Sequence, residues 1–255
     1  MSTTPRLWPA ILTFVVATAA LSQALVIAAA AWQVEAVSLV QFGPALGAAV
    51  TWAVFPAQLR QFLPARVPSR EAGWRSLIAL AASAGFAAIL AVLWRLSGHT
   101  LHGLQAVAGV PFVLVAILWL AGAAGEEIGW RGLLQPLLEH RVGRLGAAVC
   151  TGLLWAIWHV PMFAMGAAIA ALFTASTVLL SVLLAVLGHG SPAQRVAPAS
   201  VAHWLVNLAV LVVIGETPTA SSLVWQLVAI AVATAAVVAL LRHRLTERTA
   251  PAGRP

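Results

Sequence analysis

The sequence contains no lysine, aspartate or tyrosine, and its single cysteine is Cys150. One cysteine excludes an intrachain disulfide and a metal site built from several thiolates. Charged residues make up 8% of the 255 residues, whereas a soluble domain carries about 25%. This composition excludes a soluble globular domain, and the excess of apolar residues (62%) excludes a disordered chain. The sequence therefore predicts an all-α, polytopic integral membrane protein.

Eight apolar segments are long enough for membrane-spanning helices, which need about 20 residues each. The fourth helix is expected to continue past Ala124 toward Glu139, and Met165 and Gly166 mark the join between the fifth and sixth. The first segment is too long for the apolar part of a signal peptide. The eight predicted spans are Leu7–Ala31, Val37–Leu59, Ser76–Leu96, Ala106–Ala124, Gly146–Gly166, Ala167–His189, Ala197–Ile214 and Ser221–Leu241.

All 14 basic residues are arginines, and their positions predict the orientation. A cytoplasmic N-terminus places 12 of them in cytoplasmic segments and only Arg95 outside, with Arg131 left in an apolar stretch. Because cytoplasmic loops carry the excess of arginine, we expect both termini in the cytoplasm. The arginines of the cytoplasmic segments then account for the net charge of +7, and binding to nucleic acid is not needed to explain it. Residues 1–255 are expected to form one membrane-embedded domain with a catalytic core at about 106–214.

Three charged side chains, Glu126, Glu127 and Arg131, lie between apolar runs. Each charge at the centre of a spanning helix costs about 2.5–3.5 kcal/mol. Glu127 and Arg131 are four residues apart and can pair on one helix face, which leaves Glu126 without a structural role. A hydrated loop after Ala124 is the alternative interpretation. We favour a functional site, because ionisable residues within a membrane typically mark one.

Two further polar pairs have the same spacing of four residues, about one helical turn. Trp155 and His159 lie in the fifth span, and His203 and Asn207 lie in the seventh. A single histidine in a span more often packs through a hydrogen bond than it catalyses. Three spans that each supply polar groups instead favour a water-activating site, with a glutamate as general base and a His–Asn pair as oxyanion donors. Glutamate with two histidines also resembles the ligands of a catalytic zinc.

Three ordered motifs resemble the signature of the CPBP intramembrane proteases, also called ABI, which include the type II CAAX prenyl endopeptidases. The motifs are Glu126-Glu127-x-x-x-Arg131, Trp155-x-x-x-His159 and His203-x-x-x-Asn207. Members of this family are membrane enzymes with eight helices, in agreement with the number of predicted spans. The resemblance implies an endopeptidase that hydrolyses a peptide bond in or near the membrane. One departure is visible: Trp155 stands where the second motif usually has phenylalanine, which changes the wall of the pocket more than its chemistry.

The resemblance implies catalytic roles for four residues. Glu126 activates the water and His159 helps to hold it, while His203 and Asn207 form the oxyanion site. Asparagine is a poor ligand for zinc, which favours a mechanism without a cofactor. If a divalent metal such as zinc is bound, its ligands are Glu126, His159 and His203. The expected directions of the spans place the cavity in the cytoplasmic half of the bilayer.

Three other motif residues have supporting roles. Glu127 and Arg131 form a pair that orients Glu126, and Trp155 lines the cavity wall. The expected partners are a peptide or membrane-protein substrate and the lipid bilayer of a bacterial inner membrane. Two alternatives stay open, a proton-coupled transporter that uses the acids and histidines as a relay, and a non-catalytic immunity or scaffold protein of the same fold. The sequence predicts neither the natural substrate nor the oligomeric state.

Overall fold

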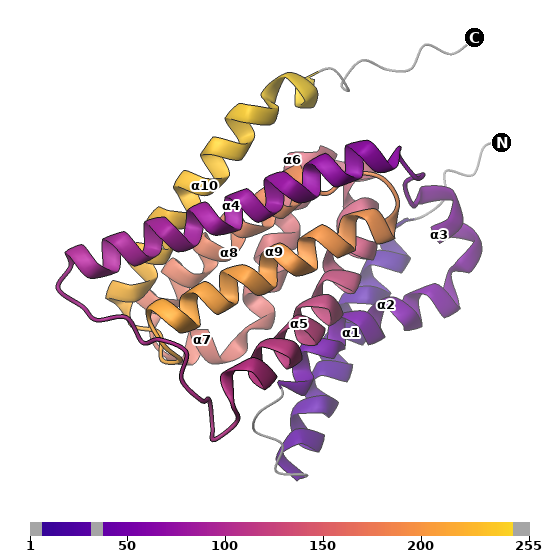
Figure 1. Ribbon diagram of the computed structural model, residues 1–255. Coiled ribbons are helices and arrows are strands. Elements are labelled where there is room, and N and C mark those ends of the chain that lie inside the picture. Colours follow the sequence, from indigo (N-terminus) through magenta and orange to yellow (C-terminus); the bar gives the residue numbers. More distant parts are fainter. Residues whose placement is uncertain (1–6, 32–37, 247–255) are drawn as a thin grey trace.

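The computed structural model describes residues 7–31 and 38–246, with side chains up to Leu241, and this part of the chain is all-α (Figure 1). Its elements are α1 (Leu7–Ala31), η1 (Leu39–Phe42), α2 (Gly43–Val54), α3 (Pro56–Phe62), α4 (Ser69–Leu96), α5 (Phe112–Gly129), η2 (Trp130–Leu134), α6 (Gln135–Trp158), α7 (Val160–Ala164), α8 (Ala167–Leu187), α9 (Pro192–Val213) and α10 (Ala220–Thr246).

The number of candidate membrane spans is lower than the expected eight. The described residues contain six helices long and apolar enough to cross a membrane, or seven if a bent pair counts as one span. The difference lies in Phe112–Trp158, where α5, η2 and α6 form one run of 47 residues. Such a run is about 70 Å long, more than twice the thickness of a bilayer core. Gly143 interrupts it with a φ of +69°, and the predicted fourth and fifth spans lie on either side of this break.

Other predicted features of the spans are confirmed. The fourth helix continues past Ala124 through η2 into α6, and it passes Glu139 without a loop. The expected join at Met165 and Gly166 is the start of α8, where Gly166 adopts a φ of +109° that favours glycine.

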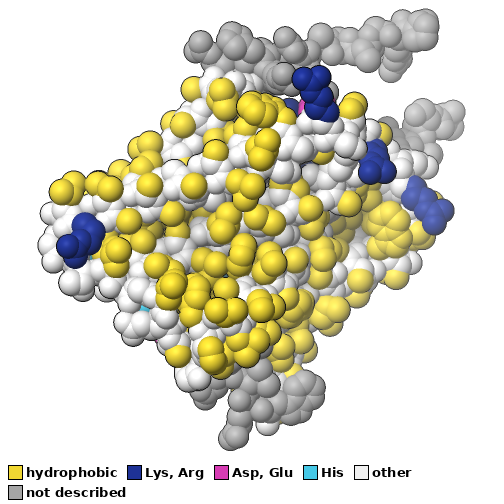
Figure 2. All heavy atoms as spheres, viewed as in Figure 1, with side chains coloured by type: hydrophobic (Ala, Val, Ile, Leu, Met, Phe, Trp, Pro, Cys, Tyr) yellow, Lys and Arg dark blue, Asp and Glu magenta, His cyan; other side chains and the backbone are white. Residues whose placement is uncertain are grey.

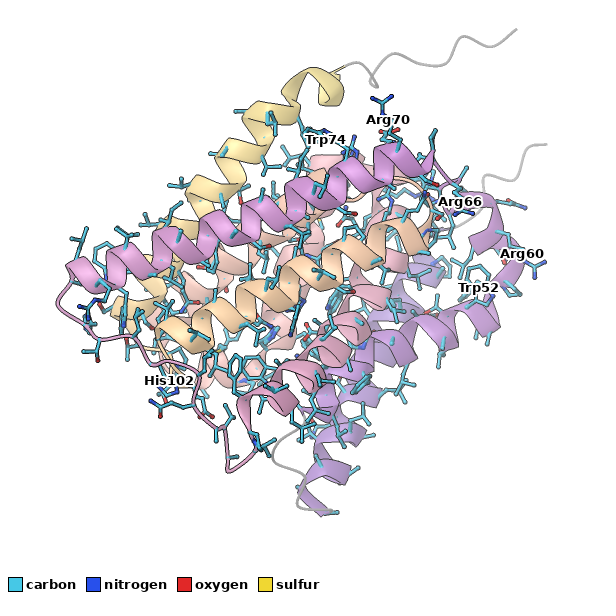
Figure 3. All side chains as sticks on the ribbon, in the orientation of Figure 1. Trp52, Arg60, Arg66, Arg70, Trp74 and His102 are labelled. Carbon is cyan, nitrogen blue, oxygen red and sulfur yellow. The ribbon has the colours of Figure 1, made fainter. Side chains whose placement is uncertain are left out.

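The second predicted span, which begins at Val37 outside the described residues, is bent. Its two helices, η1–α2 and α3, meet at 108° at Pro56. Proline has no backbone N–H to donate to the preceding turn, so it ends α2 and starts α3. The α3 helix lies at one end of the bundle, next to Arg66 (Figures 1 and 3).

Helices α1 and α2 pack closely through two glycines four residues apart. A Cβ atom at Gly43 would overlap the hydroxyl of Ser22, and one at Gly47 would overlap that of Thr18. Small residues at this spacing let the backbones of membrane helices approach. The close contact between α1 and α2 therefore depends on glycine at both positions.

The bundle has two distinct ends. At one end, which we call the arginine-rich end, residues 60–75, 139–144 and 188–195 meet. There Arg144 donates to the carbonyl groups of Ala185 and Gly188, and Arg195 pairs with Glu139 through two contacts of 2.8 and 3.0 Å. The opposite end contains residues 97–111, 160–166 and 214–219, where the backbone of the 97–111 segment bonds the last turn of α9. These contacts fix the helix directions that position the site.

Candidate functional site

One face of α5 consists of glycines, and the chain at the start of α2 packs against it. Gly122, Gly125 and Gly129 form this face, and Cβ atoms there would collide with Gln41 at the first two positions and with Pro44 at the third. Glycines three and four residues apart lie on one side of a helix, so they form a channel for residues 41–44. The α5 residues that follow Gly125 therefore face a polar side chain from outside their own helix.

Glu126 is buried, and its carboxylate accepts two hydrogen bonds from neutral N–H groups. Gln41 Nε2 donates to Oε1 at 2.9 Å, and Trp155 Nε1 donates to Oε2 at 2.6 Å. The side chain is 1% exposed. The motifs gave no role to Gln41, yet it is a polar residue inside an apolar predicted span. The criterion that selected Asn207, an amide inside a predicted span, would also have selected Gln41.

Glu127 is fully buried and contacts other partners than its neighbour does. Its Oε1 accepts hydrogen bonds from Arg131 Nη1 at 3.1 Å and from His203 Nδ1 at 3.0 Å. The Glu127–Arg131 pair predicted from the four-residue spacing is therefore present. The bond to His203, which comes from α9, is a contact that the spacing did not indicate.

Arg131 lies in the π-helical turn η2 and stacks on the ring of Trp155, with Cζ 4.4 Å from the ring centroid. Single π-helical turns inside α-helices often occur at functional sites. The expected support of Glu126 by Arg131 is indirect in this arrangement, because Arg131 contacts the ring whose N–H binds Glu126. Within the described residues, Arg131 Nε and Nη2 have no hydrogen-bond partner.

The tautomer of His159 follows from its partner. His159 Nδ1 lies 2.8 Å from the backbone oxygen of Trp155, and a carbonyl oxygen only accepts, so Nδ1 carries the proton. In the neutral ring the other nitrogen, Nε2, then has a lone pair. His159 is the residue at which α6 ends, and its backbone angles are not helical. Its ring packs edge-on against Phe173, with the ring centroids 5.0 Å apart. The charged or titratable neighbours of this ring are Glu126 and His203.

His203 is oriented in the same way. Its Nδ1 faces the Glu127 carboxylate at 3.0 Å, so Nδ1 donates. Its ring meets Trp155 edge-on at a centroid distance of 4.9 Å. Asn207 follows one turn later on α9 and is half-buried.

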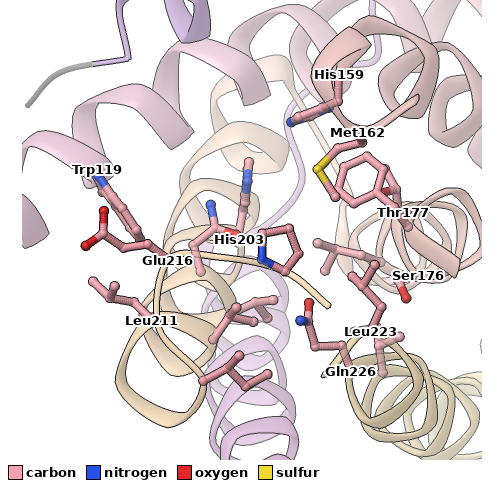
Figure 4. A pocket seen from close by; sticks show the side chains of 18 of the residues that line it. Trp119, His159, Met162, Ser176, Thr177, His203, Leu211, Glu216, Leu223 and Gln226 are labelled. Atoms are coloured by element: carbon pink, nitrogen blue, oxygen red, sulfur yellow. The ribbon is translucent and has the colours of Figure 1, made fainter. Parts of the chain in front are cut away.

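These side chains line one cavity of about 390 Å³ (Figure 4). Five predicted residues from three helical segments contribute to its wall, while Glu127 and Arg131 lie behind the wall. The residues that line it are Glu126, Trp155, His159, His203 and Asn207. The structure thus brings together the four residues with predicted catalytic roles.

The donor set does not fit a three-ligand metal site in this arrangement. In the described part of the chain, no three His, Cys, Asp or Glu side chains gather closely enough to hold a metal ion. Both Glu126 oxygens already accept N–H donors in this arrangement. We therefore derive no step through a metal.

Residues 107–209 match the family model described as "Type II CAAX prenyl endopeptidase Rce1-like". A stretch of 51 residues is 39% identical to CAAX prenyl protease 2 of Methanococcus maripaludis and covers 20% of this chain and 19% of that protein. The matched family region contains every motif residue from Glu126 to Asn207, whereas Gln41 lies outside it. The resemblance inferred from the three motifs is confirmed for this region.

Proposed function

We propose that this chain, whose residues 107–209 form a domain of the Rce1-like CAAX endopeptidase family, hydrolyses peptide bonds within the membrane by means of a glutamate-activated water. One observation carries the proposal. The buried carboxylate of Glu126 lines a cavity together with the imidazole rings of His159 and His203. In both rings Nδ1 contacts an oxygen acceptor, so Nε2 is the nitrogen that is left for the reaction. A packing role for these residues requires no shared cavity.

Glu126 and His159 are assigned to the water. Each carboxylate oxygen of Glu126 accepts one N–H and keeps a further lone pair. His159 Nε2 accepts one O–H of the water, and Glu126 accepts the proton that leaves as the water oxygen bonds to the peptide carbonyl carbon. The C–N bond breaks in the second step, and Glu126 returns the proton to the leaving amine. Glu126 is then ionised again and can accept a proton from the next water.

His203 and Asn207 are assigned to the oxyanion. Because His203 Nδ1 donates to Glu127, Nε2 donates only if the ring is an imidazolium, and the Glu127 carboxylate stabilises that charge at 3.0 Å. The Asn207 amide supplies a second N–H donor beside it. Donors that are fixed before the reaction lower the barrier without the cost of reorganising solvent.

The wider assignments are part of the same proposal. The chain is a multi-pass protein of a bacterial inner membrane with both termini in the cytoplasm, in which the Gly143 break separates two crossings. Residues 1–255 act as one domain with a catalytic core at about 106–214. The substrate is a peptide or membrane protein, and a prenylated CAAX segment is one candidate because the similar archaeal protein carries that name.

The test uses the detergent-purified full chain and an internally quenched peptide with a core of leucine, alanine and phenylalanine. Glu126→Gln and His159→Ala should each lower kcat at least a hundredfold, while the Arg95→Gln control, at an exposed position, stays at the wild-type rate. Gel filtration and tryptophan fluorescence check that each variant is folded. Activity retained in folded Glu126→Gln would refute the assignment, and a requirement for an ion gradient would favour a transporter.

A chelator separates the metal-free mechanism from a metal-dependent one. Prolonged incubation with EDTA should leave the rate unchanged, because the described side chains form no three-ligand set. Loss of activity with EDTA and recovery with Zn²⁺ would assign Glu126, His159 and His203 as ligands instead.

A further inference from the structure

The cavity extends from the Glu126 cluster toward one end of the bundle only. Its lining reaches the loop between α9 and α10, and Figure 4 shows Glu216 of this loop and His203 of α9 around the same space. Ser38 and Met162, which also line the cavity, belong to loops or short helices at this same end. The cavity therefore opens at the end opposite the arginine-rich one.

The two ends differ strongly in positive charge. Figure 2 shows basic side chains gathered toward the end at which α3 lies, and Figure 3 labels three of them. Among the residues with described side chains, only Arg95 lies at the end where the cavity opens. The arginines at the other end are Arg60, Arg66, Arg70, Arg75, Arg141, Arg144 and Arg195.

We propose that the site receives its substrate from the non-cytoplasmic face of the membrane. Arginine accumulates in cytoplasmic loops of membrane proteins, so the arginine-rich end faces the cytoplasm and the mouth at Gly215–Pro218 faces away from it. This inference rests on the proposed function for its substrate. It differs from the expected cavity in the cytoplasmic half, because the lining residues lie toward the end of α9 opposite the arginine-rich one.

The side chains that line the cavity indicate which class of substrate it binds. Between the mouth and His203 the lining is mainly apolar, with Leu211, Leu223 and Phe173 among its members. His203 and Gly215 are 12 residues apart in the sequence, about 18 Å along a helix, and an extended peptide rises about 3.3 Å per residue. The cavity thus accommodates about five extended residues, and an apolar segment matches its walls.

Glu216 adds a charge preference at the mouth. Its side chain is exposed, and within the described residues no arginine or histidine forms an ion pair with it. A carboxylate at the entrance attracts a basic side chain that follows the apolar segment. The occupant is therefore an apolar peptide segment flanked by lysine or arginine, presented outside the cytoplasm.

Sided membranes test the direction of entry. The full chain is expressed in a bacterial inner membrane and tested in right-side-out spheroplasts and in sealed inverted vesicles. The probe is an internally quenched peptide with a core of leucine, alanine and phenylalanine and two lysines at each end, which does not cross a bilayer. Cleavage should be at least tenfold faster with spheroplasts, and detergent should remove the difference.

The outcomes distinguish the two proposals. Faster cleavage by inverted vesicles would overturn the direction of entry and leave the peptidase intact, whereas no cleavage in detergent would overturn the proposed function. Cysteine labelling tests direction without any activity: in a Cys150→Ser background, Glu216→Cys should react with an impermeant maleimide from outside, and Arg66→Cys should not. The reverse pattern would also refute the direction.

Peptide charge tests the role of Glu216. A peptide with terminal lysines should have a KM several-fold lower than one with terminal glutamates, and Glu216→Lys should reverse this order. An unchanged order in a folded, active Glu216→Lys variant would refute the preference for a basic flank.

Discussion

The Glu127–Arg131 pair offers a quantitative test of how the site is held together. Both side chains are at most 1% exposed, and Glu127 Oε1 accepts from Arg131 and His203 together. Glu127→Gln preserves the shape and removes the charge, which leaves the Arg131 guanidinium buried without the carboxylate that it contacts. Breaking a buried ion pair on one side costs about 3–5 kcal/mol, so we expect the free energy of unfolding to fall by that amount.

Arg131→Met should cost less than Glu127→Gln. The Glu127 carboxylate that remains still accepts a hydrogen bond from His203 Nδ1 at 3.0 Å, so it keeps one of its two donors. Methionine also keeps an apolar chain over Trp155, so the main additional loss is the cation–π contact, about 1–2 kcal/mol. The double variant Glu127→Gln/Arg131→Met should be more stable than Glu127→Gln alone by about 2 kcal/mol, since it also removes the guanidinium that Glu127→Gln leaves without its partner.

Unfolding in mixed detergent–SDS micelles, followed by tryptophan fluorescence, gives the four free energies of this double-mutant cycle. Arg95→Gln, an exposed charge removal, is the control and should stay within about 0.5 kcal/mol of the wild type. Two results would refute the reasoning. One is a Glu127→Gln variant within 1 kcal/mol of the wild type, and the other is strict additivity of the two substitutions.

Three further predictions concern residues that support the site or the bundle. Gln41→Leu should lower kcat by about 10- to 150-fold with an unchanged KM in steady-state assays, because one hydrogen bond to the Glu126 carboxylate, worth about 1.5–3 kcal/mol, is lost. Gly122→Ala should have the same effect, since its Cβ displaces the Gln41 amide; normal kinetics in both variants would exclude Gln41 as a positioning residue. Gly143→Ala should destabilise by about 1–3 kcal/mol in SDS unfolding, because φ is +69° and ψ is 174°, a backbone conformation almost restricted to glycine, while no other atom lies near the added Cβ; an unchanged midpoint would contradict this.

The sequence predicted contacts that lie within one helix better than contacts between helices. The Glu127–Arg131 pair and the start of α8 after Gly166 follow from local spacing and backbone freedom, and both are present. The four catalytic candidates could be selected because charged and amide groups are costly in an apolar span. Their convergence on one cavity was an inference from chemistry, and local spacing did not supply it.

The missed features depend on packing between distant segments. Gln41 reaches Glu126 across 85 positions of sequence because the glycine face of α5 accepts residues 41–44. The start of α9 was placed at Ala197, yet the helix begins at Pro192. Gln194 binds the backbone of Val67, and Arg195 pairs with Glu139. Polar residues that appeared to end an apolar span are thus accommodated inside the helix by partners that spacing alone does not show.

The two adjacent acids illustrate why the first motif requires both. Consecutive residues on a helix point about 100° apart, so Glu126 and Glu127 cannot share one set of partners. Glu126 faces the cavity and accepts only neutral donors, which leaves its negative charge available to take a proton from water. Glu127 faces away from the cavity, where Arg131 and His203 neutralise it. One acid is therefore kept reactive while the other fixes a histidine of the same cavity, and a single carboxylate could not meet both requirements.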